Sequence, residues 1–301
     1  MKKLAIQLSG QLRNWSRFKK IVLPYWERIV EFGKENNVEV HFHGAFWDED
    51  HEGGEQKGFW GDTHYYSSHS DWDVFKNIKF VGTKKEIFKN SKPLGQRRKD
   101  TYKGNKSPIA SWPWGWCMYE ASKGRRLWQE KNNHNYDIVI VTRPEIYLKK
   151  NNVKEIFNKI EECSKYDFTV FSHRINHNMT TDDNWENLPY SDDGIILGTE
   201  ESINLYCTNI VFLFLDNKPK IWKDFAGHIA VPHIIKNLTL NHISPWPNTG
   251  YMLDFRLFRL NSDVAIVDPE SEKIKESNSK KLEVAELWDI NLDDAEDFHL
   301  W

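Results

Sequence analysis

The sequence predicts one α/β domain, residues 1–301, with a mostly parallel central sheet that is flanked by helices and interrupted by irregular insertions. Strand-like and helix-like segments alternate along the chain, and no linker rich in glycine, proline or serine divides them. The first strand, helix and strand are joined by short connections, which makes a βαβ unit with parallel strands. We expect two halves, residues 1–148 and 149–270, followed by an acidic tail over 271–301.

The expected elements follow from the spacing of the apolar residues. Residues 4–8 and 38–46 predict the first two strands, and residues 18–30 predict the helix between them, with a kink or break at Pro24. Pro113 suits the first turn of a helix over 113–131. The other expected elements are strands at 78–81, 136–141, 167–172, 194–198, 251–260 and 264–267, and helices at 153–163, 200–215 and 230–238.

The composition argues against several classes of protein. Lys and Arg number 41 against 44 Asp and Glu, a net charge of -3, which does not suit a protein that coats nucleic acid. The longest apolar run, residues 210–215, is too short to cross a bilayer, so we expect no transmembrane segment. Three scattered cysteines without metal-site spacing are typical of a reducing compartment, and we expect a cytoplasmic protein. The acidic tail is expected to dock on the basic segment 90–106 or to remain mobile.

The first candidate motif is Ser9-Gly10-Gln11-Leu12-Arg13, where the first strand meets a helix. Glycine at that point lets the backbone approach a phosphate, and an arginine offers two parallel N–H donors to it. The spacing matches neither the dinucleotide-binding fingerprint nor the P-loop, which argues against both of those chemistries. An ordinary strand-ending turn with a surface arginine is the alternative.

The second motif, Thr142-Arg143-Pro144-Glu145, follows the most strand-like run of the chain. A carboxylate presented at a strand end can hold Mg²⁺ or Mn²⁺ on a diphosphate, because these ions prefer oxygen ligands and share them with phosphates. The alternative is a structural ion pair between the arginine and the glutamate.

The third motif is Ser191-Asp192-Asp193-Gly194, just before a short strand. Paired acids at a turn can place one carboxylate as a general base. A solvated turn is the alternative.

Two histidines on the second strand raise the question of zinc. His41 and His43 alternate, so they share one face of that strand. The hydrolase-type pattern is not completed, since Ala45 and Phe46 stand where an aspartate and a histidine are required, and two histidines lack the third ligand of a catalytic zinc. We expect His43 either to contact a substrate or to be a core histidine.

Aromatic residues are unusually frequent, with 14 Trp, 11 Tyr and 17 Phe. Their flat faces stack on sugar rings and on bases, although packing in the core is their commoner role. Trp112, Trp114 and Trp116 cannot all share one helix face, so we expect one of them to face a ligand. Trp47 follows the second strand and is a further candidate.

Taken in order, these segments resemble small bacterial and viral glycosyltransferases of the lipopolysaccharide-core type, often called WavE-like, which have a GT-A fold. The resemblance rests on a strand followed by SGQ-x-R, a second strand ending His-x-x-x-Trp, the run Tyr-Asp-x-Val-Ile-x-x-Arg-Pro-Glu, and Ser-Asp-Asp-Gly-Ile-x-x-Gly. It covers about residues 1–215. Glu145 stands where an aspartate is usual in that family.

The resemblance implies a nucleotide-sugar donor at the carboxyl ends of the strands. Its motifs fall on Ser9, Gly10, Gln11 and Arg13 for the nucleotide, on Arg143 and Glu145 for the donor and a metal or ribose, and on Asp192 or Asp193 near the acceptor hydroxyl. We therefore expect a glycosyltransferase that moves a sugar from a nucleotide sugar to a hydroxyl of a glycan acceptor.

In this prediction Asp193, and second Asp192, removes the acceptor proton, Glu145 holds Mn²⁺ or Mg²⁺, and acceptor contacts come from His43, Trp47 and Trp114. The alternatives are a non-catalytic glycan-binding protein of the same fold and a metal-dependent hydrolase at His41 and His43. The prediction requires that the ends of strands 4–8 and 138–141 lie side by side.

Overall fold

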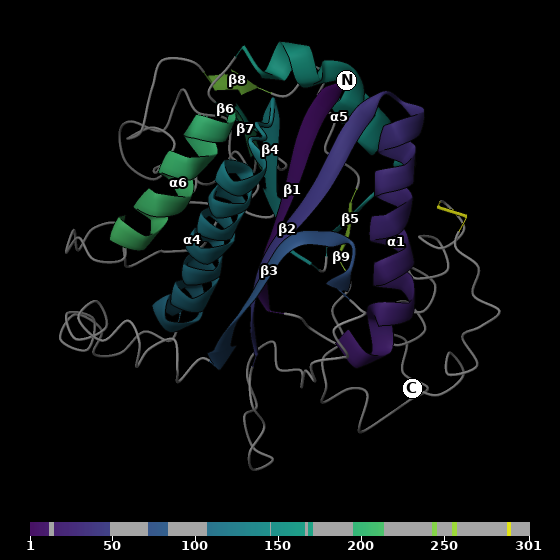
Figure 1. The fold of residues 1–301 in the computed structure, drawn as a ribbon. Coiled ribbons are helices and arrows are strands. Elements are labelled where there is room, and N and C mark those ends of the chain that lie inside the picture. Colours follow the sequence, from purple (N-terminus) through teal and green to yellow (C-terminus); the bar gives the residue numbers. More distant parts are fainter. Residues whose placement is uncertain are drawn as a thin grey trace, which may run out of the picture.

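The computed structural model describes residues 1–11, 15–48, 72–83, 107–144, 146–165, 168–170, 195–213, 243–245, 255–257 and 288–289. Seven strands of this part form one sheet in the order β3-β2-β1-β4-β7-β6-β8 (Figure 1). Their bounds, in chain order, are β1 Lys2–Gln11, β2 Val38–Asp48, β3 Phe75–Thr83, β4 Ile138–Thr142, β6 Phe168–Val170, β7 Ile195–Gly198 and β8 Ile243–Pro245.

The sheet is mostly parallel, which confirms the predicted α/β class. Strands β3, β2, β1 and β4 are all parallel neighbours, and so are β6 and β8. Only β7 among the described strands of this sheet runs against its neighbours, β4 and β6. A separate antiparallel pair is formed by β5, Ile146–Leu148, and β9, Phe255–Leu257.

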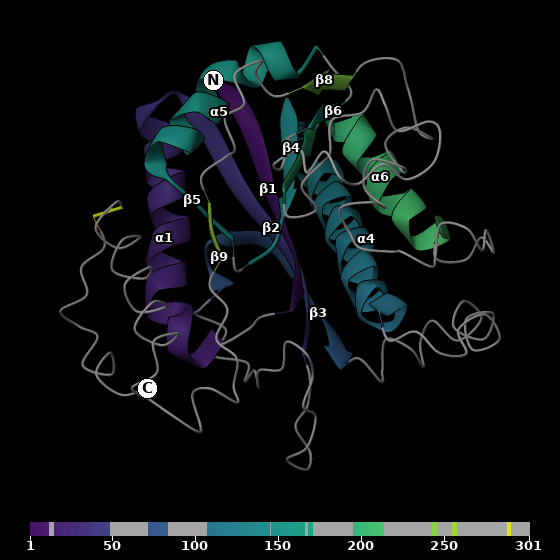
Figure 2. The same ribbon diagram turned by 180° about the vertical axis from the view of Figure 1, so that it is seen from behind.

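Helices cover both faces of the sheet. Helices α1, Trp15–Glu35, and α5, Lys150–Cys163, lie on one face, whereas α4, Ser107–Asn132, and α6, Glu200–Leu213, lie on the other (Figures 1 and 2). Among the described helices, none combines the length and the apolar character that a membrane crossing demands.

The two faces of the sheet differ in chemistry, because successive residues of a strand point to opposite sides. Leu4, Ile6 and Leu8 belong to an apolar core with α1 and α5, in which Trp26 meets the Phe75 ring edge-on at 5.1 Å. The α4 face instead buries polar side chains, including Gln7 and Arg125, both with no exposed surface. The α1 face therefore supplies most of the hydrophobic stabilisation, while the α4 face contains a hydrogen-bonded layer.

Most expected elements are found, with some corrections. Helix α1 continues through Pro24, so the prediction of a break there was wrong. Burial of the apolar face of α1, which includes Tyr25 and Trp26, stabilises the helix by more than the missing backbone hydrogen bond costs. Helix α4 begins at Ser107, six residues before Pro113, so Pro113 does not begin it. Strands β5 and β8 were not expected, and the elements expected at 230–238 and 264–267 lie outside the described residues.

Part of the acidic tail packs against α1. Trp288 is 2% exposed, and its ring meets Tyr25 and Phe32 edge-on at 5.3 and 5.8 Å. The neighbouring Asp289 carboxylate lies 3.3 Å from Lys150 Nζ. The described part of the tail therefore docks on α1 and the start of α5, while the basic segment 90–106 lies outside the described residues.

Candidate functional site

The direction of chain growth in the sheet reverses at β1. From β1 the chain passes to β2 and β3 on one side, and it then returns through α4 to β4 on the other side of β1. Ligands of open α/β sheets bind outside the carboxyl ends of the strands at such a switch point. Strands β1 and β4 are paired up to Leu8 and Thr142, so their carboxyl ends lie side by side as the sequence predicted.

A third segment reaches the same edge. Strand β7 is antiparallel to β4 and begins with Ile195 opposite Thr142. The start of β7 therefore lies beside the end of β4. Four of the predicted site residues lie outside the described residues, namely Arg13, Glu145, Asp192 and Asp193.

Gly10 and Trp114, two of the predicted site residues, are neighbours in space. Gly10 has φ of +119°, a conformation that residues with a side chain rarely adopt. A Cβ atom built on Gly10 lies 3.5 Å from Cδ1 of Trp114, and the backbone of Gly10 hydrogen-bonds the thiol of Cys117 one helix turn further along α4. The end of β1 is thus fixed against α4, with the half-buried Trp114 indole beside it.

Ser9 and Arg143 each come one residue after the last registered pair of β1 and β4. Ser9 has no exposed surface, and its Oγ has no hydrogen-bond partner among the described residues. Arg143 is half-buried, and its carbonyl oxygen accepts a hydrogen bond from the amide of Ile146, which closes a tight turn after β4. The backbones of Gln11 and Trp47 pair with each other at the same edge.

A buried polar network fixes the strand under this edge. The Gln7 side chain donates to the carbonyl oxygen of Met118 and accepts from Nε of Arg125, at 3.2 and 3.3 Å. Arg125 also donates to Gln129 at 2.6 Å and to Asn204 of α6. Burial lowers the pKa of Arg125. Because its guanidinium bonds to side chains of all three elements, Arg125 ties β1, α4 and α6 together beneath the candidate site.

His43 does not reach this edge. It pairs in register with Gln7, is fully buried, and its Nε2 lies 2.8 Å from the hydroxyl of Tyr136. Burial lowers the pKa of His43 to about 2, so its ring is neutral. The structure therefore favours a core histidine over a contact with an acceptor.

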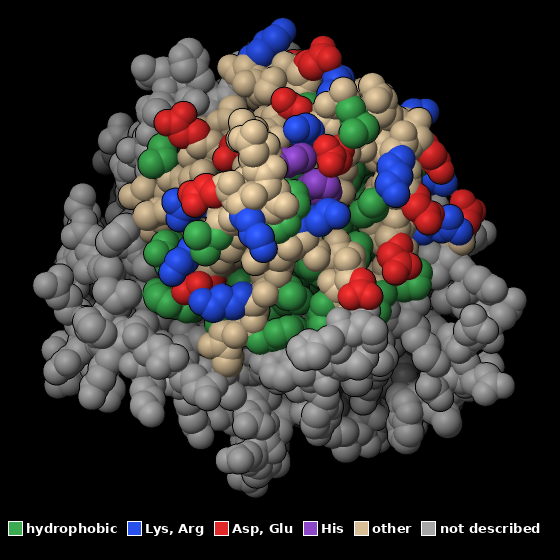
Figure 3. Space-filling view, in the orientation of Figure 1, with side chains coloured by type: hydrophobic (Ala, Val, Ile, Leu, Met, Phe, Trp, Pro, Cys, Tyr) green, Lys and Arg blue, Asp and Glu red, His purple; other side chains and the backbone are tan. Residues whose placement is uncertain are grey.

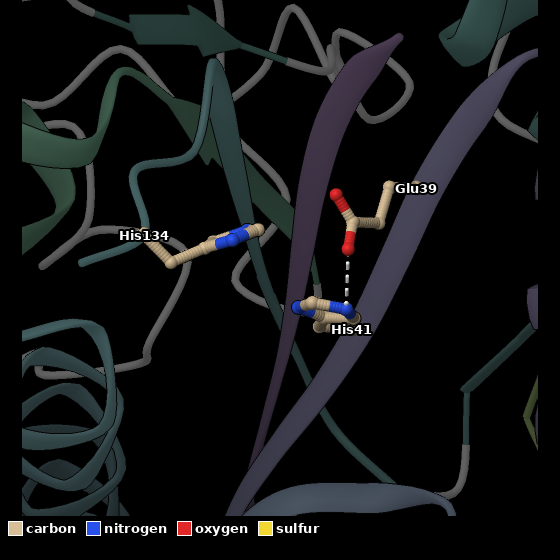
Figure 4. Close-up of side chains that lie close together, drawn as sticks. All are labelled: Glu39, His41 and His134. Atoms are coloured by element: carbon tan, nitrogen blue, oxygen red, sulfur yellow. Dashed lines mark ion pairs between the residues drawn. The ribbon is translucent and has the colours of Figure 1, made fainter. Parts of the chain in front are cut away.

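A second group of side chains lies near the opposite, amino end of β2. His41 Nε2 is 3.1 Å from a carboxylate oxygen of Glu39, and His134 comes from the connection between α4 and β4 (Figure 4). Sequence reasoning paired His41 with His43 and missed both other members. Glu39 could have been found from its position two residues before His41 on the same strand face. No pattern in the neighbouring sequence indicates His134.

No protein-family model and no curated protein matches the chain. Among solved structures, the chain is similar to the galactosyltransferase LgtC in complex with donor and acceptor sugar analogues, at 9% identity and a TM-score of 0.37, over 81% of this chain and 72% of the other.

Two further solved structures are similar at the same TM-score of 0.37. One is a glycosyltransferase involved in the glycosylation of the major capsid of PBCV-1, at 8% identity over 82% of each chain. The other is mouse xyloside xylosyltransferase 1, at 11% identity over 78% of this chain and 80% of that one.

Proposed function

We propose that this chain is a glycosyltransferase with a GT-A-like fold, which transfers a sugar from a nucleotide-sugar donor to a hydroxyl group of a glycan acceptor. The observation that carries the proposal is the meeting of three distant segments at one edge of the sheet. Ser9 and Gly10 lie at the end of β1, Arg143 follows β4, and Ile195 starts β7 opposite Thr142. That edge adjoins the switch point at which sheets of this kind bind nucleotides.

The donor diphosphate is assigned to the two arginines. Arg143 follows the end of β4 directly, and Arg13 comes two positions after Gln11, the last residue of β1. A guanidinium presents paired N–H groups that match two phosphate oxygens. Ser9 Oγ, buried and without a described partner, supplies one further hydrogen-bonding group at the strand end.

Transfer requires one bond to form as another breaks. The acceptor hydroxyl oxygen bonds to the anomeric carbon, the bond from that carbon to the diphosphate oxygen breaks, and the two arginines stabilise the negative charge on the leaving nucleoside diphosphate. In an inverting transfer a carboxylate takes the acceptor proton, a role we assign to Asp193 and second to Asp192.

Chain length supports these assignments. Asp193 is two positions before Ile195 and Glu145 directly precedes Ile146, so covalent geometry limits each backbone to within about 7 Å of a described strand residue. We propose that Glu145 holds Mn²⁺ or Mg²⁺, which supplies positive charge to the diphosphate when bound. Ser9, Thr142 and Arg143 offer no carboxylate, so Glu145 is the carboxylate that we assign to the ion.

We assign contacts with the sugars to Trp114 and Trp47. Trp114 stands beside Gly10, and the backbone of Trp47 pairs with Gln11 at the same edge. Aromatic faces stack on the C–H surface of sugar rings. No such role is proposed for His43, which is buried away from this edge. A cytoplasmic location is also proposed, since Cys117, Cys163 and Cys207 are all free and buried.

The test measures nucleotide binding and donor turnover together. The purified chain is incubated with a panel of nucleotide sugars, with and without Mn²⁺, and thermal shifts are recorded with UDP, GDP and CMP. We expect one nucleotide to stabilise the protein and its sugar donor to be hydrolysed slowly. Arg143→Ala should lower the affinity for that nucleotide at least tenfold. Arg28→Ala, which removes an exposed arginine paired with Glu31 on α1, should leave the affinity unchanged.

Asp193→Asn separates binding from chemistry. If Asp193 is the base, this variant binds the nucleotide as the wild type does but no longer transfers sugar to an acceptor. Full transfer by Asp193→Asn would remove it from that role. The absence of both turnover and a thermal shift with UDP, GDP or CMP would refute the proposal and favour the non-catalytic glycan-binding protein.

A further inference from the structure

Glu39, His41 and His134 gather their metal-binding atoms at one point of the α4 face. One carboxylate oxygen and one ring nitrogen of each histidine all lie within 4.8 Å of one another, and no other such group occurs among the described residues. Glu39 and His41 alternate on β2 and so share one side of it. Figure 4 shows His134 approaching the same point from the connection that follows α4.

The position of His134 is set by the end of α4. Asn133 has φ of +47°, in the left-handed region, and the next amide, that of His134, donates to the carbonyl oxygen of Gln129 at 3.0 Å. This turn brings the His134 ring to 5.0 Å from the His41 ring, between ring centroids. Nε2 of His134 is buried and has no hydrogen-bond partner among the described residues. A buried ring nitrogen beside a second imidazole and a carboxylate calls for a ligand.

The surroundings hold His41 in a fixed orientation. Its Nδ1 lies 2.9 Å from the hydroxyl of Tyr136, which in turn lies 2.8 Å from Nε2 of His43. Metal-binding histidines commonly use their second ring nitrogen in this way. The Trp128 ring meets both His41 and His134 edge-on, at 5.2 and 5.3 Å. Histidine side chains reach the surface on this face, bordered by acidic and basic groups (Figure 3).

We propose that Glu39, His41 and His134 bind Zn²⁺, with water as the fourth ligand. Zinc sites of two imidazoles and one carboxylate are common, and their tetrahedral geometry places ligand atoms about 3.3 Å apart. The Glu39 and His41 atoms are already 3.1 Å apart, so a small movement of the half-buried His134 completes the set.

The ligand chemistry selects zinc over magnesium. Two of the three ligand atoms at this point are imidazole nitrogens, and the third is a carboxylate oxygen. Carboxylate, carbonyl and water oxygens suit Mg²⁺, whereas imidazole nitrogens suit Zn²⁺.

This site is separate from the proposed transfer site. His41 pairs in register with Ala5, and Gly10 lies five residues further along β1, a distance of about 16 Å. The ion would join β2 to the connection between α4 and β4. The zinc proposal therefore does not depend on the proposed glycosyl transfer.

The test uses the full chain after removal of metals with EDTA. Zn²⁺, Mn²⁺ and Mg²⁺ are titrated separately by calorimetry, and melting temperatures are recorded with each ion. We expect one Zn²⁺ per chain, a raised melting temperature with Zn²⁺, and no comparable effect of Mg²⁺. An anomalous difference map at the zinc absorption edge should place the ion between the three side chains.

The matched variants are His134→Gln and Glu130→Gln. His134→Gln removes one ligand and should weaken Zn²⁺ binding at least tenfold, whereas Glu130→Gln, an exposed residue in the last turns of α4, should not change it. The circular dichroism spectrum and melting temperature of each metal-free variant show whether it is folded. Absence of stoichiometric Zn²⁺ binding, a zinc peak elsewhere, or unchanged binding by folded His134→Gln would overturn the proposal.

Discussion

The indole N–H of Trp288 donates a hydrogen bond to the carbonyl oxygen of Leu148 at 3.0 Å, although 140 residues separate them in the sequence. Leu148 is held from the other side as well, because its amide donates to the Tyr25 hydroxyl at 2.8 Å. A residue of the C-terminal tail thereby closes the apolar layer between α1 and β5, the short strand that follows the Arg143 turn. The tail helps to fix the segment that carries Arg143.

Trp288→Ala should destabilise the fold by about 3–5 kcal/mol, the usual loss for a buried aromatic side chain. Trp288→Phe keeps a ring but removes the indole donor, and it should lose about 1 kcal/mol for the hydrogen bond to Leu148. Urea denaturation measures both values. Asp289→Asn is the control, because its pair with Lys150 is exposed and should change stability by less than about 1 kcal/mol. Equal stability of Trp288→Ala and wild type would show that the tail does not pack as described.

Gly10→Ala tests the backbone at the end of β1. With φ of +119° at this position, a methyl group should strain the backbone by about 1–3 kcal/mol even though the space beside Trp114 would accept it. The strand end relaxes to relieve that strain, so the nucleotide proposed to bind there should bind more weakly. Urea melts and nucleotide thermal shifts give the two readings. A variant with wild-type stability would contradict the strained conformation.

Ser9→Ala should affect binding and leave stability nearly untouched. The Ser9 hydroxyl is buried without a partner among the described residues, so its removal should change the free energy of unfolding by no more than about 0.5 kcal/mol or raise it slightly. The same change should weaken nucleotide binding if Oγ serves the ligand. If Ser9→Ala instead lost more than about 1 kcal/mol of stability, the usual contribution of one hydrogen bond, the hydroxyl would have a structural partner.

The cysteines should be unreactive in the folded protein. Cys117, Cys163 and Cys207 are all buried, and burial raises the pKa of Cys207 to about 11 and that of Cys117 well above its usual value. Because the thiolate is the reactive form, little of it exists at pH 8. A thiol-specific reagent should therefore label none of the three in native protein and all three in denaturant. Rapid labelling of the native chain would place at least one thiol at the surface.

The parallel half of the sheet could be predicted from the sequence because its signals are local. The runs at 4–8 and 136–141 are short, apolar and bounded by turn residues, which is the pattern of strands covered on both faces. Their order along the chain, with helices between, then predicts neighbouring parallel strands. The expected meeting of the two strand ends is confirmed by the pairing of Leu8 with Thr142.

What the sequence did not reveal depends on contacts between distant residues. Strand β5 has three residues and exists through its pairing with β9, more than a hundred positions later. The layer on the α4 face is polar, so Gln7 and Arg125 gave no hydrophobic signal even though both are fully buried. His134 belongs to a turn, and only the fold brings it to Glu39 and His41.

Arg125 offers the sharpest test of that polar layer. Its guanidinium donates to Gln7, Gln129 and Asn204, and its Nη1 lies 4.0 Å from the Glu200 carboxylate. Arg125→Met removes the charge and all three donors together, which leaves buried acceptors unpaired. The loss should be about 3–5 kcal/mol, the range for breaking a buried charged network from one side.

Lys123→Met is the matched control for Arg125→Met, since Lys123 is exposed on the same helix and should change stability by no more than about 0.5 kcal/mol. The double variant Gln7→Leu with Arg125→Met should be less destabilised than the sum of the two single variants, because each single change leaves the other partner without its hydrogen bond. Strict additivity in urea melts would mean that Gln7 and Arg125 do not interact.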